Sequence, residues 1–171
     1  MIKKEYEKMV GKIKEVLERE GSVQLHEFFE KKYFKMLLNK VRKLKFNKKF
    51  NPLQYKFKEI QFNDMALVMA INGFIMHLIK KEVKEAKVYC FEAGDYTLLN
   101  DKIHEQEEYS ITFELTPKWD CSYGGYTYFI ENNKEKAKVE PTRNSLTIVK
   151  TNSRMQKFIK YINHHALHKG R

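Results

Sequence analysis

A chain of 171 residues, 42% of them hydrophobic, is long enough for one domain with a hydrophobic core and short for two. The formal net charge of +11 is uneven, because residues 1–60 carry 17 Lys and Arg against 8 Asp and Glu, a net of +9. The charged start and the lack of an apolar run near the roughly 20 residues that cross a bilayer argue against a secretory leader and a membrane partner. Two cysteines without metal-ligand spacing fit a reduced protein, so we expect a cytoplasmic location.

Two predicted helices carry the clearest signals in the first half of the chain. Apolar residues recur at intervals of three and four from Tyr6 to Leu17, and Gly21 is a typical helix end. Another helix should begin at the Asn63-Asp64 cap and run to about residue 80. This helix is apolar almost all round, so we expect other elements to cover it.

The most basic part of the chain lies between these helices. A helix predicted over residues 30–43 turns its lysines outward, and the basic run continues into a loop that Asn51 and Pro52 close. Such a cluster attracts phosphate polyanions or acidic proteins. The candidate nucleic-acid-binding residues are Lys31, Lys32, Lys35, Lys40, Arg42, Lys43, Lys45, Lys48 and Lys49.

After residue 80 the periodicity changes to that of strands. Short segments rich in Val, Ile, Thr, Phe and Tyr are separated by Gly- and Pro-containing turns, at residues 87–99, 109–115, 126–130 and 145–149. Helices followed by strands predict an α+β domain, with a mostly antiparallel sheet assembly supported by helices. We expect one domain over residues 1–171, divided into helical support and basic face (1–80), β core (81–163) and polar tail (164–171).

Three segments of the β region carry a family resemblance. Residues 91–99 contain a strand with a Gly-Asp turn, residues 115–120 read L-x-P-x-W before a double glycine, and residues 141–149 begin P-x-x-N-x-L. In this order they resemble the 2-oxoglutarate/iron(II) oxygenases of the prolyl-hydroxylase-like type. The resemblance implies a double-stranded β-helix, which is jelly-roll-like, with supporting N-terminal helices. Trp119 in the second segment is expected to plug the turn rather than to bind substrate.

The same resemblance implies an iron site whose ligands are not matched. Enzymes of this family hold iron(II) by a His-x-Asp pair and a distal His. The register of residues 95–99 places Asn100 and Lys102 at the first two positions, and Lys157 or a near neighbour falls at the third. An amide is a poor iron ligand, and an ammonium group repels the cation. This pattern argues against an active dioxygenase and for a protein without cofactors.

Replacement metal ligands remain an alternative. Asp101 and His104 lie beside the expected site, and a bulged loop could bring them to a metal ion. The chain would then be an active Fe(II)/2-oxoglutarate-dependent prolyl hydroxylase-like dioxygenase with non-standard ligands. Otherwise these residues belong to a solvated loop. The tail histidines, His164, His165 and His168, could also share one helical face, although a solvated tail is the simpler interpretation.

The combination of a degenerate oxygenase site and a basic surface indicates a binding protein. We expect a basic module for RNA or a ribonucleoprotein, and a protein adaptor with an acidic partner is the further alternative. Aromatic residues interleave with the lysines, which suits stacking on unpaired bases or anchoring in the core: Phe46, Phe50, Tyr55 and Phe57.

Overall fold

The computed structural model describes the chain except for residues 84–85, 99–100, 103–107, 117 and 168–171. Its helices are α1 (Lys4–Lys8), α2 (Val10–Glu20), α3 (Lys31–Val41) and α4 (Met65–Ile79), with short 3-10 helices at Cys121–Tyr123 and His164–Ala166. Gly21 ends α2 in the left-handed conformation, and its N–H donates to the Leu17 carbonyl. Asp64 begins α4, because its carboxylate accepts a hydrogen bond from the Leu67 N–H. Both ends were predicted from the sequence.

The strands of the described residues form three antiparallel sheets. The first has the order β1-β10-β7, from β1 (Ser22–Leu25), β10 (Ser145–Lys150) and β7 (Tyr109–Glu114). The second has the order β6-β11-β8-β9, from β6 (Asp101–Lys102), β11 (Gln156–Ile159), β8 (Thr127–Glu131) and β9 (Lys134–Val139). The third consists of β2 (Asn47–Asn51), β3 (Tyr55–Gln61) and β4 (Lys87–Cys90), with β5 (Tyr96–Thr97) paired to β3. This helix-supported antiparallel assembly confirms the predicted α+β class.

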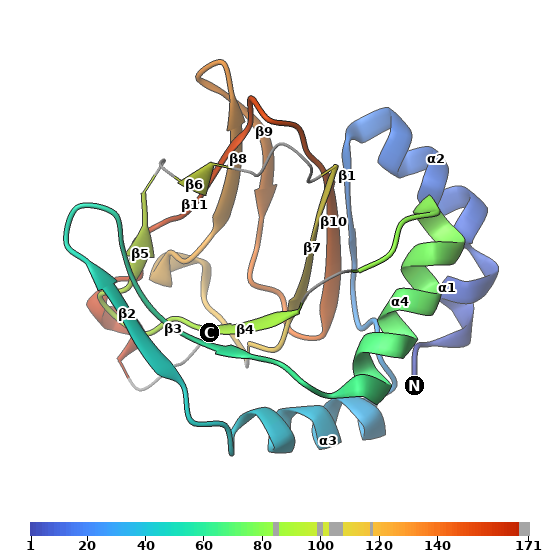
Figure 1. Ribbon diagram of the computed structural model, residues 1–171, viewed down its shortest axis with the longest axis horizontal. Helices are drawn as coiled ribbons and strands as arrows, with labels where there is room; N and C mark the ends of the chain where they lie inside the picture. Colours follow the sequence, from blue (N-terminus) through green and yellow to red (C-terminus); the bar gives the residue numbers. More distant parts are fainter. Residues whose placement is uncertain (84–85, 99–100, 103–107, 117, 168–171) are drawn as a thin grey trace.

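The main core lies between the helices and the first sheet. Helices α1, α2 and α4 cover the outer face of β1-β10-β7, and α3 crosses below it (Figure 1). Leu17 of α2, Ile75 of α4 and Ile148 of β10 are each 0% exposed, and they meet Phe28 and Phe29, which follow β1. These aromatic rings pack edge to face with neighbours, and each large buried side chain contributes about 1.5–3 kcal/mol.

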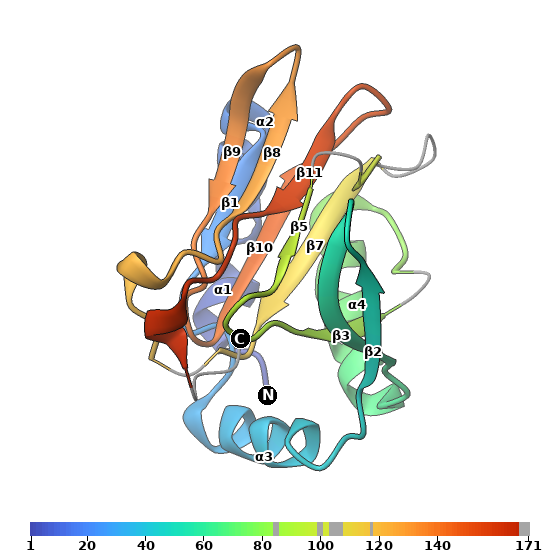
Figure 2. The same cartoon turned by 90° about the vertical axis from the view of Figure 1, so that its left-hand side faces the viewer.

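A second cluster joins the first two sheets. Phe129 of β8, Val139 of β9 and Val149 of β10 pack together with Met155. Figure 1 shows these two sheets facing each other, and Figure 2 shows the third sheet beyond β7. The interior between the sheets is therefore filled by side chains near β8, β9 and β10.

Several strands and surfaces differ from the sequence prediction. Strands β1 to β3 lie before residue 80 in a region predicted as helices and a loop, and β2 carries lysines of that loop. Helix α4 is not covered all round, since Met65 and Met69 are each 69% exposed. Within the segment predicted as a polar tail, Ala166 is 0% exposed. Among the described helices, none combines the length and apolar character needed to cross a membrane.

Candidate functional site

The family-like segments converge on a junction near the C-terminal end of the described chain. The Gly94 N–H donates to the Ile162 carbonyl at 2.7 Å, and the Ile162 N–H donates to the Asp95 carbonyl at 3.0 Å. On the other side, the Gly125 N–H donates to the Lys160 carbonyl at 3.1 Å. Residues 160–162, which follow β11, thus lie between the Gly-Asp turn and the double glycine. Both motifs bind this segment through backbone hydrogen bonds.

Glycine is required at the centre of this junction. Gly124 has φ of 81° and ψ of −142°, and a Cβ at this position would lie 2.2 Å from the Tyr161 carbonyl oxygen. The Trp119 indole donates to the Gly124 carbonyl at 3.0 Å and packs edge to face on Tyr123. Trp119 is therefore a structural plug of the turn, as the sequence analysis predicted.

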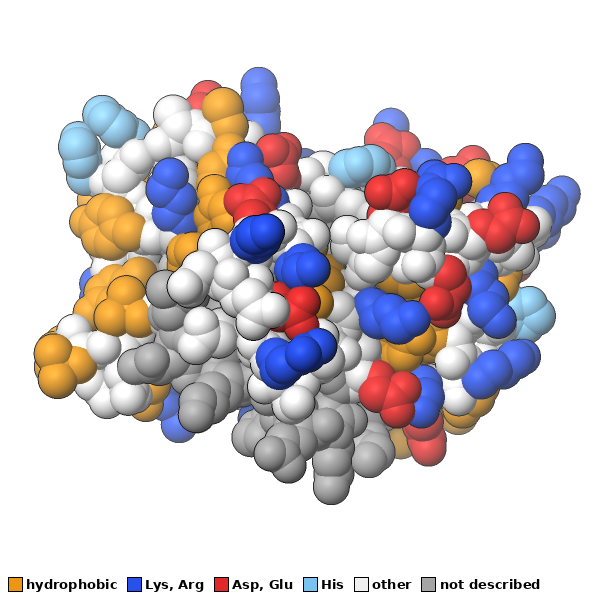
Figure 3. Space-filling view, turned by 90° about the horizontal axis from the view of Figure 1, so that it is seen from above, with side chains coloured by type: hydrophobic (Ala, Val, Ile, Leu, Met, Phe, Trp, Pro, Cys, Tyr) orange, Lys and Arg blue, Asp and Glu red, His pale blue; other side chains and the backbone are white. Residues whose placement is uncertain are grey.

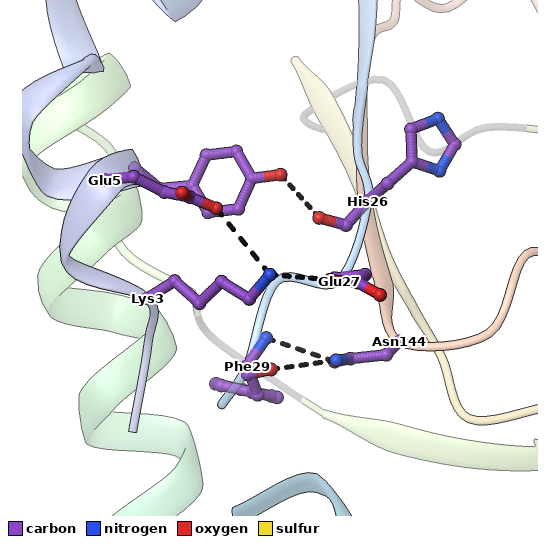
Figure 4. A network of polar contacts seen from close by, with 7 residues as sticks. Lys3, Glu5, His26, Glu27, Phe29 and Asn144 are labelled. Atoms are coloured by element: carbon purple, nitrogen blue, oxygen red, sulfur yellow. Dashed lines mark hydrogen bonds and ion pairs between the residues drawn. The ribbon is translucent and has the colours of Figure 1, made fainter. Parts of the chain in front are cut away.

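The third motif residue, Asn144, has an equally structural role. Its side-chain amide donates to the Phe29 carbonyl at 2.8 Å, and its Oδ1 accepts from the Phe29 N–H at 3.0 Å (Figure 4). Beside it, Lys3 forms ion pairs with Glu27 and Glu5, and these contacts fasten the N-terminal segment to the turn after β1. The motif residues that carry the resemblance therefore build the fold rather than a reaction site.

Two of the three positions expected to hold iron lie on one strand pair. Strand β6 pairs with β11, so that Asp101 lies opposite Lys157 and Lys102 lies opposite Gln156. The topology thus brings the second and third expected positions onto neighbouring strands. Asn100 and His104 lie outside the described residues.

The residue types of this strand pair do not fit an iron ion. A facial triad needs two imidazoles and one carboxylate, whereas Lys102, Gln156 and Lys157 provide two ammonium groups and one amide. Asp101 is the single carboxylate of the four paired positions. Within the described residues, no group of three or more His, Cys, Asp or Glu is placed to hold a metal ion.

The isolated histidines and cysteines differ in their exposure. His26 and His77 are exposed. Cys90 is half-buried, and this burial raises the pKa of its thiol, which disfavours the nucleophilic thiolate. Cys121 is exposed and free.

In the tail, His164 and His165 are both exposed, with ring centroids 4.1 Å apart. His168 lies outside the described residues. The alternative to a solvated tail, in which these imidazoles share one face, stays untested, because one of the three side chains is not described.

The nine candidate nucleic-acid-binding residues are all exposed, and we call them the basic surface. Two of them have carboxylate partners: Lys40 pairs with Asp64 at 2.7 Å, and Lys49 pairs with Glu59 at 3.2 Å. The hydrogen bond to Asp64 raises the pKa of Lys40, so this side chain stays charged. The other seven form no ion pair with a described carboxylate: Lys31, Lys32, Lys35, Arg42, Lys43, Lys45 and Lys48.

Two lysines of β9 have carboxylate partners. On β9, Lys136 pairs with Glu131 at 3.3 Å, and Lys138 pairs with Glu140 and lies over the Tyr126 ring. Figure 3 shows the face opposite α3, where basic side chains alternate with carboxylates. The excess positive charge is therefore concentrated around α3 and β2, as the sequence predicts.

The comparisons with known proteins agree with this architecture. A family model described as "Oxoglutarate and iron-dependent oxygenase degradation C-term" matches residues 66–171. The chain therefore belongs to the oxoglutarate and iron-dependent oxygenase degradation C-terminal family. The resemblance to prolyl-hydroxylase-like oxygenases, inferred from three motifs, is confirmed.

Two curated relatives and several solved structures are similar to this chain. It is 32% identical over 74 residues to prolyl 3-hydroxylase OGFOD1 of Xenopus laevis and 29% identical over 86 residues to that of Mus musculus. The match spans 40% and 47% of this chain but only 14% and 15% of those proteins.

A prolyl-4-hydroxylase of Pseudomonas putida has a TM-score of 0.74 at 13% identity, covering 95% of this chain and 94% of that one. A prolyl hydroxylase of Trichoplax adhaerens has a TM-score of 0.71 at 14% identity, covering 93% and 86%. At such identities the likeness shows the fold, and it confirms the jelly-roll prediction.

Proposed function

We propose that this domain is a catalytically degenerate member of the oxygenase family that binds RNA or a ribonucleoprotein through its basic surface. The observation that carries the proposal is the set of seven exposed cations without carboxylate partners around α3 and β2. Such side chains keep their full charge available for phosphates. Neutralising several phosphates at once releases counterions and supplies most of the affinity for a polyanion.

The strand pair β6–β11 supports the loss of turnover. Lys102 and Lys157 occupy two of the positions where the family resemblance expects iron ligands, and their backbones lie on neighbouring strands. An ammonium group at either position would repel a divalent cation, which is the opposite of what a metal site needs. The scaffold is thus better suited to binding than to oxidation.

A triple substitution tests the RNA proposal. In K43Q/K45Q/K48Q, three exposed lysines without carboxylate partners lose their charge, and the fold should remain intact because none of them contributes to the core. RNA affinity should fall by about fivefold or more at low salt. The slope of log affinity against log salt should become shallower by about 0.7 for every lysine that contacts a phosphate. Fluorescence anisotropy with labelled RNA at several salt concentrations measures both quantities.

The matched control is K134Q/K136Q/K138Q on β9, which removes the same number of charges from partly neutralised positions. This variant should retain nearly the affinity and the salt slope of the unchanged protein. Equal effects of the two triple substitutions, or no salt-sensitive RNA binding at all, would contradict the proposal. The basic surface would then be a solubility feature or the docking site of an acidic protein.

A further inference from the structure

The third sheet aligns Phe50, one of the aromatic residues that the sequence suggested for base stacking, with side chains of β3 and β5. Phe50 of β2 lies opposite Lys56 of β3, and Lys56 lies opposite Tyr96 of β5. Residues directly opposite in antiparallel strands point to the same side of the sheet. Phe50, Lys56 and Tyr96 therefore form an aromatic–lysine–aromatic row on one face, which we call the stacking row.

The geometry of the stacking row is fixed by its neighbours. Lys56 forms an ion pair with the buried Asp95 at 3.1 Å, and the Tyr96 hydroxyl donates to the Pro52 carbonyl at 3.0 Å. Adjacent strands are about 4.8 Å apart, so Phe50 and Tyr96 rise from backbones about 10 Å apart. Stacked nucleotides advance about 3.4 Å each along a strand, so about three would span the row.

Exposure distinguishes Phe50 from the two aromatic residues of β3, which are half-buried. The Phe50 side chain is 66% exposed, and it belongs to no buried cluster of the described residues. On the opposite face, Tyr55 and Phe57 contact each other at 5.3 Å, and Phe57 packs on the buried Phe91. Phe57 thus serves as a core anchor and Tyr55 packs on it, whereas Phe50 leaves an aromatic ring in solvent.

The surroundings of the row favour an anionic ligand with flat faces. Lys48, two residues before Phe50 on the same face of β2, is exposed and forms no ion pair with a described carboxylate. An exposed ring beside a free cation matches the pairing of base stacking with phosphate neutralisation.

We propose that the stacking row binds unpaired bases of single-stranded RNA, with Lys48 contacting the adjoining phosphates. This proposal rests on the proposed RNA-binding function and specifies which form of RNA is bound. In a duplex the base faces are already stacked on one another, so Phe50 and Tyr96 have no free face to cover. The protein should therefore prefer single strands over duplexes.

The experiment compares F50A with the unchanged protein on an oligouridylate of about ten nucleotides and on a duplex of equal length. Stacking is worth about 1–3 kcal/mol per base, so F50A should bind the oligouridylate at least about fivefold more weakly. Duplex binding should stay unchanged, and the salt slope should not move, because no phosphate contact is lost. F50Y keeps a ring and should restore most of the affinity.

L53A is the matched control, because Leu53 is 79% exposed at the tip of the same hairpin but has no ring to stack. It should bind both RNAs as the unchanged protein does. If RNA binds but F50A has no effect, the stacking row is wrong while the proposed function stands. If no RNA binds, the proposed function itself is wrong. If F50A and L53A instead weaken binding to phosphatidylserine vesicles equally, without a single-strand preference, the hairpin tip meets a lipid surface and the row is overturned.

Discussion

Asn144 joins two segments that lie 115 residues apart in the sequence. It adopts a left-handed φ of 55°, which asparagine tolerates better than most residues, and it is 7% exposed. Its amide group satisfies both the N–H and the carbonyl of Phe29. The asparagine of the P-x-x-N-x-L segment therefore has a structural role in this domain, because it joins the turn after β1 to the start of β10.

The first residue-scale prediction is that N144D destabilises the protein by at least about 2 kcal/mol at neutral pH. A carboxylate can still accept from the Phe29 N–H, but it places a second acceptor against the Phe29 carbonyl. Protonation turns that oxygen into a donor, so the difference between N144D and the unchanged protein should shrink in acid. Urea unfolding at several pH values measures this difference. A variant as stable as the unchanged protein at neutral pH would show that the contact is dispensable.

The second residue-scale prediction concerns Asp64, whose carboxylate caps α4 and pairs with Lys40 of α3 at 2.7 Å. The hydrogen bond from Lys40 lowers the Asp64 pKa, and the Leu67 N–H lowers it further. A depressed folded-state pKa gives stability that is present above the unfolded value near 3.8 and is lost as the pH falls through the lowered pKa. D64N keeps a capping side chain but loses the charge, so it should be slightly less stable than the unchanged protein at pH 6 to 7.

The stability difference between D64N and the unchanged protein should disappear in strong acid. Thermal unfolding followed by circular dichroism between neutral and acidic pH checks this expectation. K40Q offers an independent test, because it removes the same ion pair from the other side and keeps the helix cap. A difference that stays constant with pH would mean that the Asp64 charge contributes nothing.

At the scale of elements, the pair β6–β11 decides whether the domain can hold iron. Because Lys102 and Lys157 lie on these strands, we expect no stoichiometric iron(II) after anaerobic loading and no consumption of 2-oxoglutarate. Metal analysis of the desalted protein and a 2-oxoglutarate assay measure the two outcomes. Tight iron binding that D101A or H104A abolishes would instead support the hydroxylase alternative.

Strand elements also mark the limit of what the sequence could predict. Helices α2 and α4 were predictable because Gly21 and Asp64 mark an end and a start that depend on local contacts alone. The β2–β3 hairpin was missed because its lysines favoured a loop. The alternation of aromatic residues and lysines over residues 55–58 was the available signal, since a period of two indicates a strand.

Another missed hairpin had a clear local signal. Asn132 and Asn133 both have positive φ, of 52° and 59°, and connect β8 to β9 in the two-residue turn that asparagine favours. The stacking row was harder to predict from the sequence. Phe50 and Tyr96 are distant in the chain, and only the pairing register of β2, β3 and β5 brings them together. Pairing between distant strands depends on the whole fold, so the stacking row could not be predicted from local pattern.

At the scale of the whole molecule, charge and core are separated in space. The helices α1, α2 and α4 shield one face of the first sheet, whereas α3 and the β2–β3 hairpin present most of the positive surface at the other side (Figure 1). This division lets lysines of the basic surface be replaced without disturbing the core, which is why the charge substitutions above can be interpreted as binding effects. The same division makes the scaffold and the proposed binding function separable by mutation.

The sheet order β1-β10-β7 has a consequence for synthesis of the protein on the ribosome. Strand β1 pairs with β10 alone, and Leu25 lies opposite Leu146, so β1 has no partner until most of the domain has been made. At roughly 5–20 residues per second, the nascent chain waits on the order of ten seconds with this edge open. During that interval α2 and the apolar α4 have no sheet to cover, and such exposed surfaces favour chaperone binding. Contacts this distant in sequence also slow folding after release, so nascent molecules should remain unfolded longer than those of a helical bundle of equal size.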